Sequence, residues 1–168
     1  MSLSRNALLA LVGLTLVLHD AEEYLTFPGF FASPGRLSGC LSTLAFQHNT
    51  HELRLALVAA TVLPLCFVIA AVLTQRRWLL VAVLFLESVL LVNALGHTIA
   101  ALINGGYVPG LITALLINLP FGVYLLRRAV RESWVPPAAV WQMIAVAIVV
   151  HVVWLSSGLW AVTQTTRG

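Results

Sequence analysis

Four ionisable residues lie close together near the end of the first apolar stretch: His19, Asp20, Glu22 and Glu23, in the run L-V-L-H-D-A-E-E-Y-L. His19, Glu22 and Glu23 stand at positions i, i+3 and i+4, the spacing that places side chains on one face of a helix. Imidazole and carboxylate groups are ligands that suit zinc, iron and manganese. At the centre of a membrane helix each charged residue costs roughly 2.5 to 3.5 kcal/mol, so the group needs pairing, protons or a bound cation.

Two further groups carry the same residue types. In Q-H-N-T-H-E-L-R, the residues His48, His51 and Glu52 repeat the i, i+3, i+4 spacing. Farther along, Glu87 lies within an apolar stretch, and Asn93 and His97 share a helical face in V-N-A-L-G-H-T. We expect the side chains of the three groups to converge if the segments that carry them pack together.

The segments that must position these residues are membrane helices. Of 168 residues, 60% are hydrophobic and only 9% are charged, whereas soluble domains are about 25% charged. A helix needs about 20 apolar residues to cross a membrane. The sequence therefore predicts an all-α, polytopic membrane bundle that forms one domain over 1–168, with an outer loop at 28–52. Its five predicted transmembrane helices are 7–27, 53–74, 78–103, 107–126 and 138–162.

The arginines predict the orientation of this bundle. Six of them fall on one side of the membrane if the N-terminus is inside and the C-terminus outside: Arg5, Arg76, Arg77, Arg127, Arg128 and Arg131. Arginine is enriched on the cytoplasmic side of membrane proteins. The basic residues lie mostly at helix ends, so we expect membrane lipids as partners and no nucleic acid. In this topology the His and Glu groups fall mainly in the outer half of the bilayer, with Glu87 deeper.

The resulting hypothesis is a metal centre shared by three helices. We expect iron or zinc, as one ion or two, because several imidazole and carboxylate groups come from different helices. The chain contains no lysine, which excludes a Schiff-base cofactor. The predicted ligands are His19, Glu22, His51, Glu52 and His97; Glu23 and Glu87 are the predicted catalytic proton carriers; His48, Asn93 and Asp20 would support the ligands through hydrogen bonds.

Three classes of function stay open at this point. The first is a membrane-embedded metal-dependent enzyme, oxidative or hydrolytic, that acts on a small lipophilic substrate. The second is a metal-free cyclase or isomerase of terpenoids, in which a neutral carboxylic acid protonates an alkene. The third is a transporter that binds a metal ion or a proton. Gly96, Gly105 and Gly106 suit packing within one chain or between copies, so a homo-oligomer also stays open.

At H-D-A-E-E the sequence resembles the HXXEE family of small bacterial multi-pass membrane proteins, with His19, Glu22 and Glu23 at the named positions. The runs H-N-T-H-E, N-A-L-G-H and G-Y-V-P-G-L look like its remaining features, so the resemblance covers nearly the whole chain. It implies a multi-pass protein of the bacterial cytoplasmic (inner) membrane whose defining polar site contains these three residues. It implies no particular reaction.

Overall fold

The computed structural model describes the backbone of residues 3–31 and 50–165 and the side chains of residues 3–30 and 54–153. Within these ranges all regular structure is helical. The predicted all-α fold is confirmed, and each of the five predicted segments corresponds to a helix. The elements are α1 (Arg5–Phe31), α3 (Thr50–Thr74), α4 (Arg77–Asn104), α5 (Leu111–Thr113), the π-helix η1 (Ala114–Asn118), α6 (Leu119–Arg131) and α7 (Pro137–Thr165).

Several helix boundaries differ by a few residues from the sequence prediction, most in the first and fourth segments, and the fourth runs to Arg131 instead of residue 126. The first helix was expected to end near Pro28, but α1 includes Pro28 and runs to Phe31. The fourth was expected to start at residue 107, but α5 starts at Leu111. The intervening residues form a turn, because Gly105 and Gly110 adopt left-handed backbone conformations, with φ of 67° and 81°, that non-glycine residues rarely adopt.

Among the residues whose side chains the structure describes, three helical stretches are long and apolar enough to cross a membrane: Arg54–Thr74, Arg77–Asn104 and Leu111–Arg131. Many of the large apolar side chains on the outside of the bundle are strongly exposed, such as Leu73, Leu102 and Leu116. Such a surface is suited to lipid, since soluble monomers rarely expose large continuous apolar patches. Length and composition thus indicate a membrane protein.

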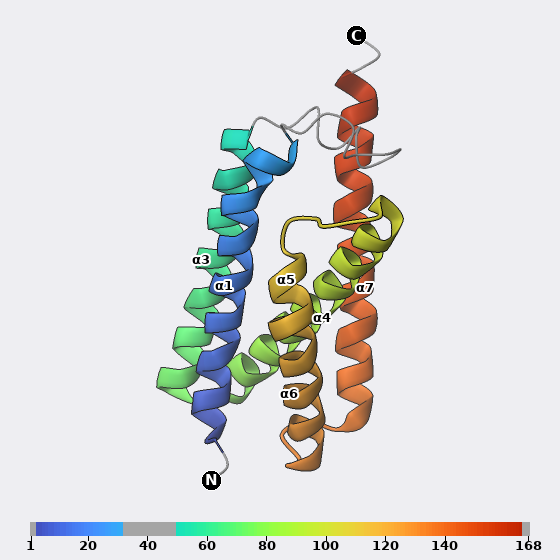
Figure 1. The fold of residues 1–168 in the computed structure, drawn as a ribbon. Helices are drawn as coiled ribbons and strands as arrows, with labels where there is room; N and C mark the ends of the chain where they lie inside the picture. Colours follow the sequence, from blue (N-terminus) through green and yellow to red (C-terminus); the bar gives the residue numbers. More distant parts are fainter. Residues whose placement is uncertain (1–2, 32–49, 166–168) are drawn as a thin grey trace.

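The helices form a bundle that α4 crosses obliquely, behind α1 and the α5–α6 stretch in the view of Figure 1. Helices α1 and α3 run antiparallel side by side, and α7 packs against α4. The α5–η1–α6 stretch packs against α4 on the side that also faces α1. Leu8, Val12, Leu84 and Leu125 are among the fully buried residues of the core between these helices.

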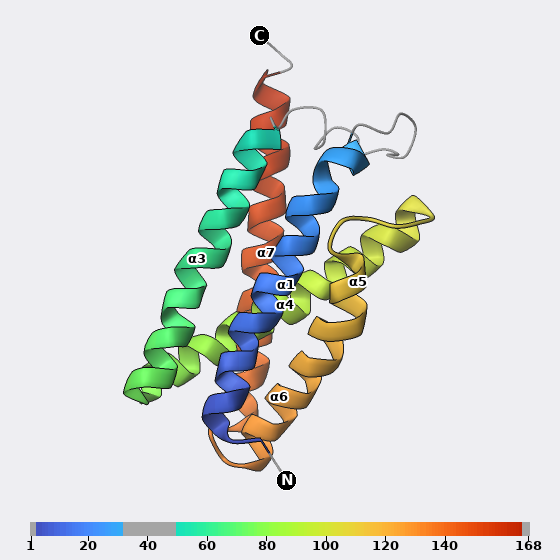
Figure 2. The same cartoon turned by 60° about the vertical axis from the view of Figure 1, so that its left-hand side comes forward.

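The bundle has one arginine-rich end. The guanidinium group of Arg5, at the start of α1, donates to the side chain of Gln75 after α3 (3.0 Å), and Arg128, near the end of α6, donates to the carbonyl of Leu3 (2.7 Å). Helix α1 starts at this end and α7 ends at the opposite one, as both views show (Figure 2). The structure thus gathers the arginines as expected, while the N-in orientation stays a prediction.

Candidate metal centre

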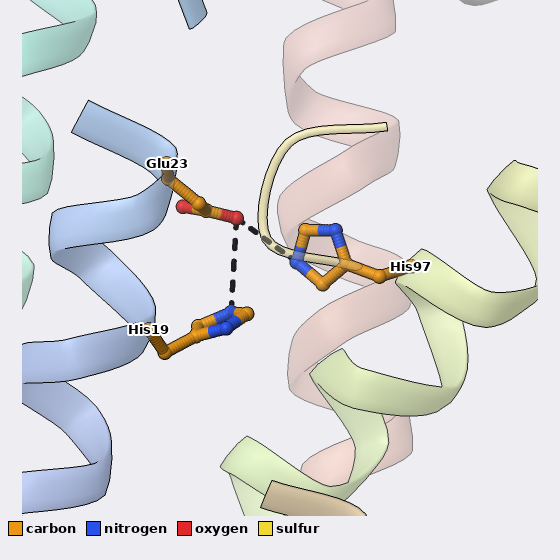
Figure 3. Close-up of side chains that lie close together, drawn as sticks. All are labelled: His19, Glu23 and His97. Atoms are coloured by element: carbon orange, nitrogen blue, oxygen red, sulfur yellow. Dashed lines mark ion pairs between the residues drawn. The ribbon is translucent and has the colours of Figure 1, made fainter. Parts of the chain in front are cut away.

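Three side chains converge between α1 and α4 (Figure 3). Glu23 Oε1 lies 2.9 Å from His97 Nε2 and 3.7 Å from His19 Nε2. One ligand atom from each residue lies within 4.8 Å of the other two. With metal–ligand bonds of about 2.1 Å, adjacent ligand atoms lie about 3.0 Å apart in octahedral and about 3.4 Å apart in tetrahedral geometry. His19, Glu23 and His97, here termed the metal centre, could therefore hold one ion.

Helix geometry places these ligands. His19 and Glu23 are one turn apart on α1, so they point to the same side, and the crossing of α4 brings His97 opposite them. His19 and Glu23 are buried, and His97 is partly buried. Asn93, one turn before His97, joins the two helices. Its Nδ2 lies 2.8 Å from His19 Nε2 and 3.1 Å from His97 Nε2.

A hydrogen-bonded chain fixes the orientation of the His19 ring. The hydroxyl of Thr113 lies 2.6 Å from Glu22 Oε2 and 2.8 Å from His19 Nδ1. A hydroxyl has one hydrogen, and a carboxylate is the stronger acceptor. Thr113 therefore donates to Glu22 and accepts from the Nδ1–H of His19. This arrangement leaves a lone pair on His19 Nε2, the nitrogen that faces Glu23, and it resembles the way in which metal-bound histidines are oriented in proteins.

Glu22 binds the start of the fourth helical stretch instead of facing the metal centre. Its carboxylate accepts from the backbone N–H groups of Ile112 (3.1 Å) and Thr113 (2.7 Å) and from the Tyr107 hydroxyl (2.9 Å). Free N–H groups and the positive end of the helix dipole favour an anion at this position. Partial burial raises the pKa of the Tyr107 phenol, so Tyr107 keeps the proton that it donates.

Gly110 closes the metal centre with backbone. A Cβ atom at this position would lie 2.9 Å from His19 Cε1, 2.9 Å from His97 Cε1 and 3.0 Å from Glu23 Oε1. Such contacts are closer than real Cβ atoms accept, and the φ of 81° is itself a glycine conformation. Because Gly110 has no side chain, the turn between α4 and α5 packs directly against these three residues.

The other predicted residues lie elsewhere. Asp20 faces α3 and accepts from the Thr61 hydroxyl (2.5 Å). His48 lies outside the described residues, and so do the side chains of His51 and Glu52, whose backbone belongs to α3. Glu87 is fully buried ten residues before His97 on α4, which is about 15 Å along the helix. Of the five predicted ligands, the structure therefore brings together His19 and His97, with Glu23 as their partner.

Sequence reasoning did not identify Thr113, Gly110, Tyr107 and Thr61 as parts of the site. Thr113 and Tyr107 contact Glu22 across 91 and 85 positions of sequence, and no local spacing reports such contacts. The G-Y-V-P-G-L turn contained the relevant signal. Two glycines around a proline indicate a constrained turn, although they do not show which side chains it covers.

The fold and this cluster define a helical membrane protein with a buried group of two histidines and one glutamate that could hold a metal ion. Residues 10–125 match the family model described as "Protein of unknown function with HXXEE motif". The chain belongs to this HXXEE family. No curated protein and no solved structure matches the chain.

Proposed function

We propose that the protein is a membrane-embedded, metal-dependent enzyme that acts on a lipid-soluble substrate. The observation that carries the proposal is the buried convergence of His19, Glu23 and His97, with the His19 ring oriented by Thr113. Two histidines and one carboxylate leave coordination positions open for water, oxygen or substrate. The three long apolar helical stretches support a location in a membrane, which we take to be the bacterial inner membrane, and the distribution of arginines supports placing the centre in the outer half of the bilayer.

The donor set suits two kinds of chemistry. Two imidazoles and one carboxylate bind iron in many oxygen-activating enzymes and zinc in hydrolytic ones. A bound ion would supply either oxygen activation or a water molecule of lowered pKa. The protein's own contribution is to hold His19 in one tautomer and to keep the ligands buried. The Asn93 Nδ2 atom is 2.8 Å from His19 Nε2 and 3.1 Å from His97 Nε2. Rotation of the amide by about 180° would place its oxygen, a possible ligand, between these two nitrogens.

An apolar groove beside the metal centre supports a lipophilic substrate. It has a volume of about 380 Å³ and lies between the end of α4 and the α5–η1 stretch. Its lining includes Thr98, which follows His97 in the sequence, and Leu111, which follows Gly110. Gly105 and Gly106 also line it and add no side chains to the groove. Leu102 and Leu115 line it and are exposed on the surface that would face lipid. A hydrocarbon chain could therefore enter from the bilayer.

The Glu23–His97 contact favours a second candidate function, a metal-free acid–base enzyme. The carboxyl and the imidazole are 2.9 Å apart, close enough to share a proton, and such a pair can donate to or accept from a substrate. This candidate uses the same groove and needs no metal ion. Activity that persists in a strong chelator would favour it over the metal-dependent enzyme.

Metal analysis of purified protein tests the proposal. After loading with Zn²⁺ or Fe²⁺ and removal of free metal, we expect about one ion per chain in the wild type. His19→Ala and Glu23→Gln should reduce the metal content about tenfold or more, because each removes a ligand. Asp20→Asn is the matched control, since it alters a buried carboxyl on the same helix that contacts Thr61 instead. Wild-type protein without stoichiometric metal, or metal retained in both ligand variants, would contradict the proposal.

A further inference from the structure

A second pair of buried polar side chains lies deeper in the bundle, apart from the metal centre. Glu87 on α4 and Asn118 at the end of η1 are both 0% exposed. None of the four polar atoms of these two side chains has a hydrogen-bond partner among the described residues. Buried polar groups in proteins are nearly always hydrogen-bonded. By contrast Ser88, the neighbour of Glu87, is equally buried and donates to the carbonyl of Leu84.

The backbone is shaped to admit the Glu87 carboxyl. A Cβ atom at Gly122 would lie 2.8 Å from Glu87 Oε1 and 3.3 Å from Leu91 Cδ1, so glycine leaves room for the carboxyl in its present position where α6 faces Glu87. Asn118 is one turn before Gly122, and both are buried on the stretch that packs against α4. Four residues of helix rise about 6 Å along the axis, so Asn118 lies one turn from the position where α6 meets the Glu87 carboxyl. This placement allows one water molecule to bridge the two side chains.

Among the described residues, no positively charged group pairs with Glu87. The elements that pack around α4, and α4 itself, carry the following other charged groups and histidines with described side chains: Arg5, His19, Asp20, Glu22 and Glu23 on α1, Arg54 on α3, Arg77 and His97 on α4, Arg127, Arg128 and Arg131 on α6, and His151 on α7. None of them forms an ion pair with Glu87 among the described residues. An isolated buried carboxylate costs several kcal/mol, whereas the neutral acid gains a donor and keeps an acceptor.

We propose that Glu87, Asn118 and the Gly122 notch form a proton-binding site, in which the neutral Glu87 carboxyl is linked by water to the Asn118 amide. The ligand of this site is a proton with its bridging water, distinct from the ion of the metal centre. The acid and the amide are complementary, because each offers a donor and an acceptor. The π-helical turn that ends at Asn118 fits such a role, since π-turns occur frequently at functional sites.

Infrared spectroscopy of the metal-free wild-type protein at neutral pH tests this site. We expect a carbonyl band of a protonated carboxyl that shifts in D₂O and is lost in Glu87→Gln. Glu132→Gln is the control, because Glu132 is paired with Arg128 and should contribute only carboxylate bands. A wild-type spectrum without a protonated carboxyl, or a band unchanged in Glu87→Gln, would overturn the proposal. A carboxylate band from Glu87 that responds to Na⁺ would also overturn it, in favour of a cation site.

Asn118→Leu provides a second readout that leaves Glu87 in place. If the amide and the acid share a bridging water, loss of the amide weakens the hydrogen bond to the carboxyl, and its band should move to higher frequency. A band that stays at the wild-type position would show that Asn118 does not belong to the site. Because these spectra need no metal and no substrate, their outcome is independent of the proposed enzymatic function.

Discussion

Within the HXXEE motif, neighbouring residues make different contacts. His19 and Glu23 belong to the metal centre, whereas the Glu22 carboxylate accepts hydrogen bonds from the backbone N–H groups of Ile112 and Thr113 in α5. Thr113 connects the two arrangements, because its hydroxyl lies between Glu22 and His19. Ligand orientation and the position of the fourth helical stretch therefore depend on the same carboxylate.

Thr113→Val tests this connection at the level of one hydroxyl group. Valine keeps the shape of threonine and leaves the backbone N–H bond to Glu22, but the Nδ1–H of His19 loses its acceptor. We expect metal affinity to fall about 10- to 100-fold, with a loss of about 1 to 3 kcal/mol in the free energy of unfolding, because a buried donor is left without an acceptor. Competition titration with a metal indicator and thermal unfolding measure the two quantities.

Thr74→Val is the matched control for this variant. The Thr74 hydroxyl donates only within its own helix, to the carbonyl of Ala70 (2.7 Å), at the arginine-rich end of the bundle. It should leave metal affinity unchanged. Equal affinity in the Thr113→Val protein and the wild type would show that the Thr113 hydroxyl does not orient His19.

At the scale of elements, two helices supply the ligands and a turn encloses them. The oblique course of α4 brings His97 to α1 (Figure 3), and the turn after α4 places Gly110 against all three ligands. The turn is anchored at Tyr107 and Thr113 through Glu22. The metal centre therefore depends on the conformation of residues 105–110 as well as on the ligands.

Gly110→Ala should disrupt the metal centre without removing a ligand. The new Cβ would approach His19, Glu23 and His97 within about 3 Å, and alanine disfavours a φ of 81°. We expect at least tenfold weaker metal binding and a destabilisation of about 1 to 3 kcal/mol, measured by metal titration and thermal unfolding. Gly106→Ala is the control, because a Cβ there has no described atom within 4 Å. A Gly110→Ala protein with wild-type affinity would contradict the described enclosure.

At the scale of the whole molecule, the two ends of the bundle differ in charge. Arg5 and Arg128 lie at the end where α1 begins, as do the helix boundaries that carry Arg76, Arg77, Arg127 and Arg131, whereas Arg54 lies at the start of α3 over the Tyr24 ring. His97 is close to the end of α4, so the metal centre lies nearer the opposite end of the bundle. If the arginine-rich end is cytoplasmic, as the distribution of positive charge in membrane proteins predicts, the metal centre lies in the outer half of the bilayer. The apolar groove would then open towards the outer leaflet, the side from which the proposed function needs its substrate to enter.

Cysteine labelling in intact cells tests this orientation. In a background with Cys40 and Cys66 replaced by serine, we expect Gly106→Cys to react with a membrane-impermeant maleimide from outside. Ser133→Cys, in the turn between α6 and α7, should react only after the membrane is permeabilised. The reverse pattern would place the arginine-rich end outside, against the prediction.

Much of the fold could be predicted from the sequence, because length and hydropathy determine where membrane helices lie. The five helical segments and the shared end of the arginines were predicted in this way. Only part of the candidate site could be predicted from the sequence. Periodicity placed His19 and Glu23 on one face, but Glu22 lies on nearly the same face, and the hydrogen bonds that turn it towards Thr113 cross 91 positions. Such long-range contacts leave no periodic signal in the chain.

The π-helical turn at Ala114–Asn118 sets the angle about the helix axis between the residues of the two polar sites. Thr113 precedes this turn and contacts the metal centre, while Asn118 ends the turn and Gly122, one helical turn later, faces Glu87. If the same residues wound as an α-helix, everything beyond them would be rotated by about 100° relative to Thr113. Only one of the two sites could then remain aligned with α4. The extra residue of the π-turn thus allows one helical stretch to contribute residues to both polar sites.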